Sequence, residues 1–242
     1  MNKLQQVLII ANKMIFPTLD GGAVAMRKLT DILISQNYVI DIVSISKNNN
    51  PHISDPPVKS THNNNQIAQF NFKKNMGFSS TNALQSILHG TSYQANRFYH
   101  TKINDFIQKK INTKTYSIII FESIFTTIYL DKLTIPTSTK IILRAHNIEH
   151  KIWENLAQKT FSKKLIFLIL SRQIKKLETT TPKKVNYILT LSELDKKYFI
   201  KIFPKKTYNL PVFFTTTENI VPKISNSIVH LGAMDWKPNI EG

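Results

Sequence analysis

The sequence of 242 residues contains no cysteine, and this absence removes several classes of protein at once. A disulfide scaffold, a thiolate zinc site and a cysteine nucleophile all require that residue. A chain without cysteine fits a reducing compartment, so we expect a cytoplasmic protein.

Long hydrophobic runs are absent as well. The longest purely apolar run is Leu165 to Leu170, whereas a helix that crosses a bilayer needs roughly 20 apolar residues. The N-terminal segment has Lys3 as its only early charge and no small-residue cleavage site after a long apolar stretch. We therefore expect neither a transmembrane helix nor a signal peptide.

Arginine is scarce although the chain is strongly basic. There are 32 Lys and Arg residues against 15 Asp and Glu, for a formal charge of +17. Proteins that read bases and phosphates rely on the bidentate guanidinium of arginine, so we expect no nucleic-acid partner. A proteome biased towards Lys, Asn and Ile explains the charge, and contact with an anionic membrane surface is the alternative. The four arginines are Arg27, Arg97, Arg144 and Arg172.

Glycine is also rare, with 6 residues where average usage of about 7% would supply roughly 17. Two of them, Gly21 and Gly22, are adjacent and lie between the first expected strand and the first expected helix. Such a pair lets a ligand approach the backbone closely, and the N–H groups at the start of a helix favour an anion such as a diphosphate. The alternative is a tight turn without a ligand.

Short apolar runs alternate with segments of helical periodicity along the chain. This order predicts an α/β fold with a Rossmann-like, doubly wound and mostly parallel sheet. The content of 42% hydrophobic residues suffices for one substantial core. Strands are expected at 7–11, 38–45, 66–72, 116–121, 140–144 and 185–191, and helices at 23–36, 92–111, 147–156, 162–179 and 193–202.

Two polar segments divide this pattern. Residues 47–65 are rich in Asn, Pro and Ser and are expected to form a long exposed loop. Residues 212–226 are expected to be a linker, after which Ile228 to Leu231 opens a new strand. We therefore divide the chain into a domain at 1–211, a linker at 212–226 and, at 227–242, the first strand and loop of a truncated C-terminal domain. The alternative is that this tail packs onto the first domain.

Candidate ligand-binding residues follow the expected strands. No G-x-G-x-x-G follows the first strand and no G-x-x-x-x-G-K-[ST] occurs, which argues against NAD and P-loop sites. His146 and Asn147 follow the strand 140–144, and there they could hydrogen-bond sugar hydroxyls or position a proton transfer. Alternatively, Asn147 caps the next helix and His146 is packed or solvated. Glu149 and His150 could reach the same crevice or be ordinary residues of the first helical turn.

A similar junction follows the strand 185–191. Ser192 is expected to be the N-cap of the next helix, with Asp195 three residues later completing a capping box. Glu193 is favoured by the helix dipole whether or not a ligand binds nearby.

Four segments in this order carry a resemblance to a known family. The sequence resembles group 1 (family 4) glycosyltransferases of the GT-B fold over essentially its whole length, and the last segment, which contains G-x-M-D-W-x-P-N, is the most specific. The segments are 16–23 (FPTLDGGA), 144–149 (RAHNIE) with Trp153, 189–193 (LTLSE) and 231–239 (LGAMDWKPN).

The resemblance implies transfer of a sugar from a nucleotide-sugar donor to a hydroxyl of a carbohydrate or lipid-linked acceptor, as in polysaccharide biosynthesis. It also implies that the anomeric configuration of the transferred sugar is retained. It implies no cofactor and no obligatory metal. His146 would be the catalytic residue beside the transferred sugar, while Gly21, Gly22 and Gly232 would bind the donor diphosphate and sugar. The residues that would line the cleft or contact the acceptor are Asp20, Arg144, Asn147, Glu149, Ser192 and Glu193.

The resemblance is incomplete in one respect. The family's nucleotide-binding residues, including two glutamates seven positions apart, belong to the second domain and are absent here. We therefore expect an acceptor-side half that is inactive by itself. Two other functions stay open: a sugar-nucleotide epimerase of the same fold, and a non-enzymatic basic module that binds anionic polymers.

Membrane contact is a separate hypothesis, which would place the protein at the inner face of the cell membrane. Two segments combine lysines with apolar residues, as interfacial helices do, and the alternative is a core helix with solvated lysines. They are 163–170 (KKLIFLIL) and the lysines of 196–206 around Tyr198, Phe199 and Phe203.

Overall fold

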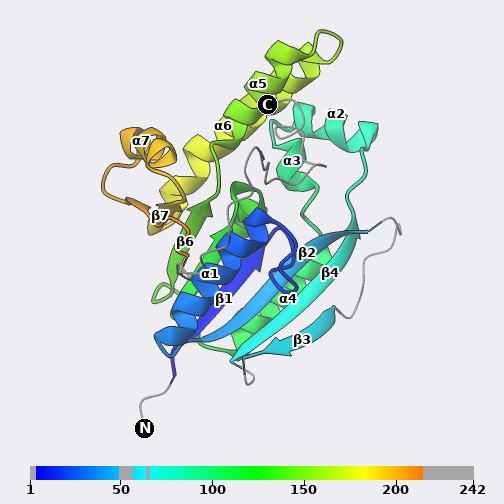
Figure 1. Ribbon diagram of the computed structural model, residues 1–242. Coiled ribbons are helices and arrows are strands. Elements are labelled where there is room, and N and C mark those ends of the chain that lie inside the picture. Colours follow the sequence, from blue (N-terminus) through cyan, green and yellow to red (C-terminus); the bar gives the residue numbers. More distant parts are fainter. Residues whose placement is uncertain (1–3, 49–56, 64–65, 215–242) are drawn as a thin grey trace, which may run out of the picture.

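The computed structural model describes residues 4–48, 57–63 and 66–214. In these residues one sheet of eight strands has the order β3-β4-β2-β1-β5-β6-β7-β8 (Figure 1). Every neighbouring pair is parallel except β3 and β4. The strands are β1 Gln6–Ala11, β2 Val39–Asn48, β3 Val58–His62, β4 Ile67–Asn75, β5 Ile118–Glu122, β6 Lys140–Ala145, β7 Tyr187–Thr190 and β8 Thr207–Asn209.

Helices lie on both faces of the sheet (Figure 1), as expected when parallel strands are joined by right-handed crossovers. Thus the doubly wound α/β class expected from the sequence is confirmed. The α-helices are α1 Gly21–Ser35, α2 Ser80–Leu88, α3 Tyr93–Asn96, α4 Thr101–Thr113, α5 Glu149–Lys159, α6 Lys164–Thr180 and α7 Glu193–Ile202. Two 3-10 helices are η1 Ile124–Lys132 and η2 Thr181–Lys184.

The alternation of side chains along the central strands produces two hydrophobic cores. Val7 and Ile9 of β1 face the core that contains Met26 of α1. Leu8 and Ile10 face the opposite core, which contains Ile107 of α4. Because β1 is buried on both faces, its sequence is a continuous apolar run rather than an alternating one.

The prediction of one long loop at 47–65 is wrong in part. Residues 58–62 form β3, which pairs with β4 in the antiparallel direction at the edge of the sheet. Most of its side chains are exposed, so the strand is held by backbone hydrogen bonds and has no hydrophobic pattern that a sequence could show. The short edge strand β8 escaped prediction for the same reason.

The prediction of a single helix at 92–111 is also wrong. Two helices, α3 and α4, replace it, and each has its own N-cap: Ser92 accepts a hydrogen bond from Ala95, and His100 accepts one from Lys102. The segment before them contains the further helix α2, which the sequence did not predict and which is capped by Ser79. Capping side chains thus divide a stretch whose apolar spacing looks continuous.

The expected linker from residue 215 onward, the strand at 228–231 and Gly232 lie outside the described residues. Within the described part of the chain, no helix is both long and apolar enough to span a bilayer.

Candidate active site

The order of the strands reverses next to β1, and this defines where a ligand is expected. The chain proceeds from β1 to β2 on one side and later places β5 on the other side of β1. In open α/β sheets, ligands bind beyond the carboxyl ends of the strands at such a reversal. At that edge Ala11 of β1 is paired with Glu122 of β5, and Glu122 with Arg144 of β6. The carboxyl ends of β1, β5 and β6 therefore lie side by side.

Gly21 and Gly22 are the first two residues of α1, so they are helical and do not form the turn before it. A Cβ atom at Gly21 would meet no atom within 4 Å, whereas one at Gly22 would lie 3.2 Å from both Asp20 Oδ1 and Lys13 Nζ. The fold itself therefore leaves open space around Gly21, which is what a ligand approaching the backbone requires.

Asp20 occupies the N-terminal end of α1. Its Oδ1 accepts a hydrogen bond of 2.9 Å from Ala23 N, and its Oδ2 pairs with Lys13 Nζ at 2.9 Å. Burial acts to raise the pKa of Asp20, but the Lys13 ammonium and the N–H groups of Ala23 and Gly22 outweigh it and lower the pKa. The carboxylate thus satisfies part of the anion-binding capacity of this helix end, and Lys13 adds a cation that the sequence did not single out.

Gln69 of β4 fixes the loop between β1 and α1. Its Oε1 accepts hydrogen bonds of 3.1 Å from both Ile15 N and Phe16 N, and its Nε2 donates to Phe16 O at 2.6 Å. The side chain is only 2% exposed. A single buried amide therefore satisfies three backbone groups and sets the path of the loop that leads to Asp20 and Gly21.

Glu122 and His146 form a hydrogen-bonded pair at the centre of this edge. Glu122 is the last residue of β5 and is fully buried, and its Oε2 lies 2.6 Å from His146 Nε2. Burial acts to raise the pKa of Glu122, but the Arg144 charge and the His146 hydrogen bond outweigh it, so the pKa lies below the usual value. Glu122 is consequently ionised at neutral pH.

An ionised carboxylate can only accept a hydrogen bond, so the proton on His146 Nε2 points towards Glu122. This arrangement fixes the ring orientation and leaves Nδ1 as the nitrogen available to a ligand. The His146 side chain is 12% exposed, which permits contact with a bound molecule. A carboxylate that orients a histidine in this way is a common feature of proton-transfer sites.

Arg144 lies behind this pair and is 1% exposed. Its Nη1 donates to Glu122 Oε1 at 3.2 Å and to Ala25 O of α1 at 2.9 Å. The guanidinium therefore joins β5, β6 and α1, and it neutralises the buried carboxylate. Its position allows it to support the site but not to contact an acceptor.

The start of α5 contains the other residues expected near His146. Asn147 is exposed and donates to Glu149 Oε1 at 3.3 Å, but it does not cap the helix. The acceptor at this helix end is Glu178 of α6, which receives hydrogen bonds of 2.7 Å from Glu149 N and 2.5 Å from His150 Nδ1. His150 is 3% exposed, so it belongs to the packing of α5 against α6.

Glu149 is half-buried in an acidic neighbourhood. Its burial raises its pKa, and the negative charges of Glu178 and Asp195 add to this, against the opposing hydrogen bond from Asn147 and the His146 charge. The charges that act on Glu149 come from α6, α7 and the end of β6. The β6–α5 and β7–α7 junctions are therefore neighbours in space.

Ser192 caps α7 as expected. Its Oγ accepts from Asp195 N at 3.1 Å and lies 2.5 Å from Asp195 Oδ2. Glu193 is exposed and pairs with Lys196 at 3.5 Å. Capping explains Ser192 completely, and the described contacts of Glu193 are those of a surface residue.

The structure thus brings together Asp20, Gly21, Gly22, Arg144 and His146 at one sheet edge, with Asn147 and Glu149 beside them and Ser192 and Glu193 at the next junction. Sequence reasoning missed Glu122, Lys13 and Gln69. Glu122 could have been found, since it is an acidic residue that directly ends a buried apolar strand. Among residues 4–48, 57–63 and 66–214, no three His, Asp or Glu side chains are grouped so as to hold a metal ion.

Comparison with known proteins gives a match in structure but not in sequence. No protein-family model matches the chain, and no curated protein is similar in sequence. Sucrose-phosphate synthase from Thermosynechococcus elongatus superposes with a TM-score of 0.53 at 11% identity, over 86% of this chain and 48% of that one. The catalytic domain of starch synthase IV from Arabidopsis thaliana, bound to ADP and acarbose, has a TM-score of 0.49 at 10% identity, over 87% and 52%.

The match with sucrose-phosphate synthase shows that the chain shares the doubly wound α/β fold of part of that enzyme. The chain spans about half the length of these two proteins, 48% of the sucrose-phosphate synthase and 52% of the starch synthase domain.

Proposed function

We propose that the protein is a retaining glycosyltransferase that transfers a sugar from a nucleotide-sugar donor to a hydroxyl acceptor. In this proposal the chain supplies the N-terminal, acceptor-side domain, and the nucleotide is bound largely by a second domain. The observation that carries the proposal is the Glu122–His146 pair at the reversal of strand order, 2.6 Å apart and backed by Arg144.

The pair suits the proposed reaction in two ways. First, His146 Nδ1 can hydrogen-bond a hydroxyl of the transferred sugar and so hold the reacting carbon in place. Second, Glu122 prevents the ring from turning, because its hydrogen bond fixes the opposite nitrogen. His146 is accordingly the proposed catalytic residue, and Glu122 is a positioning residue that acts through it.

The donor diphosphate is proposed to bind at the start of α1. Departure of the nucleotide leaves negative charge on the diphosphate, which backbone N–H groups and a cation stabilise. The open space at Gly21 admits the phosphate, and Lys13 can turn from Asp20 towards it because its side chain is 39% exposed. No metal or other cofactor is required in this proposal, so transfer should persist in EDTA.

Sugar transfer by the intact protein tests this proposal. Labelled UDP-, GDP- and ADP-sugars are supplied with and without a glycan or lipid-linked acceptor, and transferred label is measured. We expect His146→Ala to lower kcat on the order of 100-fold, the loss typical of a missing proton-transfer or positioning group. Glu122→Gln should lower kcat by about 10-fold or more with little change in the KM for the donor.

Each outcome separates the candidate functions. Near-normal transfer by the His146→Ala variant would remove this residue from the mechanism. Interconversion of the free donor without any acceptor would identify an epimerase instead. Absence of saturable sugar-nucleotide binding, together with polymer binding that collapses in added salt, would identify a basic binding module.

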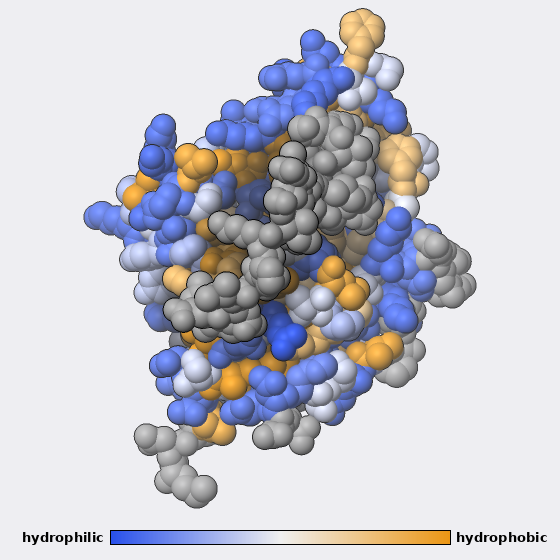
Figure 2. Space-filling view, in the orientation of Figure 1, coloured by the Kyte–Doolittle hydropathy of each residue, from blue (hydrophilic) through white to orange (hydrophobic). Residues whose placement is uncertain are grey.

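A specific observation also favours membrane contact as a second property. At the tip of the hairpin that α5 and α6 form, Phe161 is 97% exposed, Leu165 71% and Ile166 53%. Lys163 and Lys164 lie between them in sequence and are exposed too. The hairpin projects beyond the sheet in Figure 1, and Figure 2 shows hydrophobic atoms at its tip above a hydrophilic surface. Exposed apolar residues beside lysines suit an anionic lipid surface.

The second lysine-rich segment, 196–206, does not expose its aromatic residues Phe199 and Phe203. Phe199 of α7 is fully buried and Phe203 is 9% exposed, so both belong to the core and are not available to lipid. We therefore restrict the membrane proposal to the hairpin tip, which would place a cytoplasmic protein at the inner face of the membrane.

Sedimentation with vesicles that contain anionic phospholipid tests this second proposal. The double variant Phe161→Ser, Leu165→Ser should lose most of the bound fraction at physiological salt. Leu194→Ser is a matched control, because Leu194 of α7 is equally exposed, at 75%. Absence of wild-type binding, or equal loss in the control, would dismiss the membrane proposal.

A further inference from the structure

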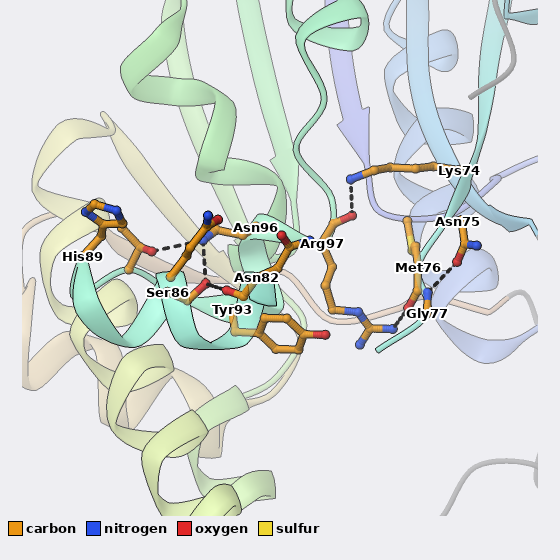
Figure 3. Close-up of a pocket in the computed structure, with 12 residues that line it drawn as sticks. Lys74, Asn75, Met76, Gly77, Asn82, Ser86, His89, Tyr93, Asn96 and Arg97 are labelled. Atoms are coloured by element: carbon orange, nitrogen blue, oxygen red, sulfur yellow. Dashed lines mark hydrogen bonds between the residues drawn. The ribbon is translucent and has the colours of Figure 1, made fainter. Parts of the chain in front are cut away.

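A ligand-sized space lies beyond the carboxyl end of β4. It is a cavity of about 350 Å³, and small-molecule sites begin at about 300 Å³. Its lining comes from the end of β4, from α2 and from α3 (Figure 3). Because β4 runs parallel to β2 and β1, the cavity opens on the same edge of the sheet as the Glu122–His146 pair.

Two cations lie in the lining without a carboxylate to balance them. Lys74 and Arg97 both line the cavity, and none of the described residues around it is acidic. Lys74 Nζ donates to Arg97 O at 2.7 Å and to Tyr99 O at 2.6 Å. The Arg97 guanidinium donates to Met76 O and, at 2.9 Å, to Gln94 Oε1. All of these acceptors are neutral, so the two positive charges are hydrogen-bonded but not neutralised.

The electrostatics of this arrangement favour a bound anion. Burial and the adjacent Arg97 charge lower the pKa of Lys74 to about 8. In addition, Arg97 Nε is buried and has no hydrogen-bond partner among the described residues. An anion beside these groups would stabilise the charged form of Lys74 and supply an acceptor for the guanidinium.

The remaining lining is typical of a site for hydroxyl groups. Its side chains are mostly amides and hydroxyls, which both donate and accept hydrogen bonds. Asn96 Nδ2 already bridges Ser86 Oγ and Thr91 Oγ1 at 3.0 Å each, which holds α3 against α2. Gln85 and His89 are exposed on the rim. A polyhydroxylated molecule with one anionic group matches this combination.

We propose that this cavity binds an anionic carbohydrate, with its phosphate or carboxylate held between Lys74 and Arg97 and its hydroxyls held by the amides of α2 and α3. Its role as the acceptor site rests on the proposed glycosyltransferase function, and the acceptor is then an acidic or phosphorylated sugar. Binding itself is independent of that function.

Titration calorimetry on the intact protein tests this proposal with four probes. These are glucose 6-phosphate, glucuronate, the neutral methyl glucoside and inorganic phosphate. We expect one of the two anionic sugars to bind at least 10-fold more tightly than the neutral sugar and than phosphate alone. The tighter of the two identifies the anionic group. Equal binding of the neutral sugar, or of phosphate alone, would overturn the proposal.

Three variants locate the site. Arg97→Gln removes one charge, and Gln85→Trp fills the cavity from its exposed rim while leaving both cations and the buried contacts intact. Both should weaken binding of the preferred anionic sugar at least 10-fold. Lys109→Gln is the matched control, since Lys109 is an exposed cation of α4 outside the cavity. Unchanged binding in Gln85→Trp would overturn the proposal even if Arg97→Gln fails to fold.

The two proposals fail in different ways. Sugar transfer without binding of anionic sugars would leave the glycosyltransferase proposal intact and remove the cavity from it. Binding that is lost in Gln85→Trp, in a protein that transfers no sugar, would support the cavity as a site and contradict the proposed reaction.

Discussion

At the scale of single residues, two buried glutamates each hold a histidine, but the two histidines have different roles. Glu122 binds His146 at 2.6 Å and Glu178 binds His150 at 2.5 Å, and both glutamates are fully buried. The pairs differ in exposure: the His146 side chain is exposed enough to contact a ligand, whereas His150 is buried where α5 packs against α6. Both pairs join a buried carboxylate to an imidazole, and only the exposure of the histidine distinguishes a candidate catalytic group from a structural one.

A prediction at this scale concerns Glu149, whose raised pKa means that its ionised form is unfavourable in the folded protein. A carboxyl with a raised pKa favours folding at low pH, and this contribution is lost as pH rises from the unfolded pKa of 4.5 towards the folded one. Glu149→Gln should therefore raise the melting temperature by a few degrees at pH 7 and change it little below pH 4.5. Thermal unfolding across this range measures the effect, and a lower melting temperature at pH 7 would contradict it.

At the scale of elements, two segments near the site depend on side chains from distant parts of the chain. α5 begins at Glu149 without a side-chain cap from its own N-cap residue, and Glu178 of α6 accepts from its first N–H groups instead. The loop before α1 is held in the same manner by Gln69 of β4.

The cap of α5 provides a prediction. Glu178→Ala removes the acceptor for Glu149 N and leaves His150 without its partner, and we expect a loss of about 3 kcal/mol in unfolding free energy. Glu178→Gln keeps one acceptor oxygen and should lose less. Chemical denaturation measures both, and equal stability of the wild type and the alanine variant would show that α5 does not depend on this contact.

The loop before α1 provides another prediction about stability. Gln69→Leu leaves two N–H groups and one carbonyl without a partner, so we expect a cost of about 2–4 kcal/mol. Backbone amides of Ile15 and Phe16 should then exchange with solvent much faster. Hydrogen exchange of these two amides is the measurement, and unchanged protection would mean that the loop is held by other contacts.

At the scale of the whole molecule, a buried polar network that stabilises the fold lies at the edge of the sheet opposite the candidate site. Asp41, near the start of β2, is 3% exposed and accepts from Tyr116 Oη at 2.6 Å and from Lys114 Nζ at 2.7 Å. Burial and the adjacent Asp41 carboxylate raise the pKa of Tyr116 above its usual value. This network lies at the edge of the sheet where the parallel strands begin, and the candidate site lies at the edge where they end.

The separation predicts that stability can be changed without changing the site. Asp41→Ala leaves the Tyr116 hydroxyl, Lys114 and Lys110, whose Nζ lies 3.5 Å from Asp41 Oδ2, without their acceptor. This should cost about 3 kcal/mol. At temperatures where this variant is folded, its affinity for anionic sugars should equal that of the wild type. Denaturation and titration calorimetry of the same preparation measure both quantities, and a parallel loss of affinity would show that the two edges are coupled.

Much of the fold could be predicted because the signals are local. β1, β2, β5 and β6 are apolar runs, and each was expected within a few residues of its place, as was the cap of α7 at Ser192. β3 and β8 could not be predicted, since edge strands carry no hydrophobic pattern.

By itself, therefore, the sequence determined a doubly wound α/β domain and the edge at which polar residues follow the strands, because periodicity and strand ends are written within short segments. Only the tertiary structure decided which side chains meet there. Glu122 and His146 are 24 residues apart, Gln69 and Phe16 are 53 apart, and Glu178 and His150 are 28 apart. These pairs depend on which strands and helices become neighbours, and that order is fixed by the packing of the whole sheet rather than by any local pattern.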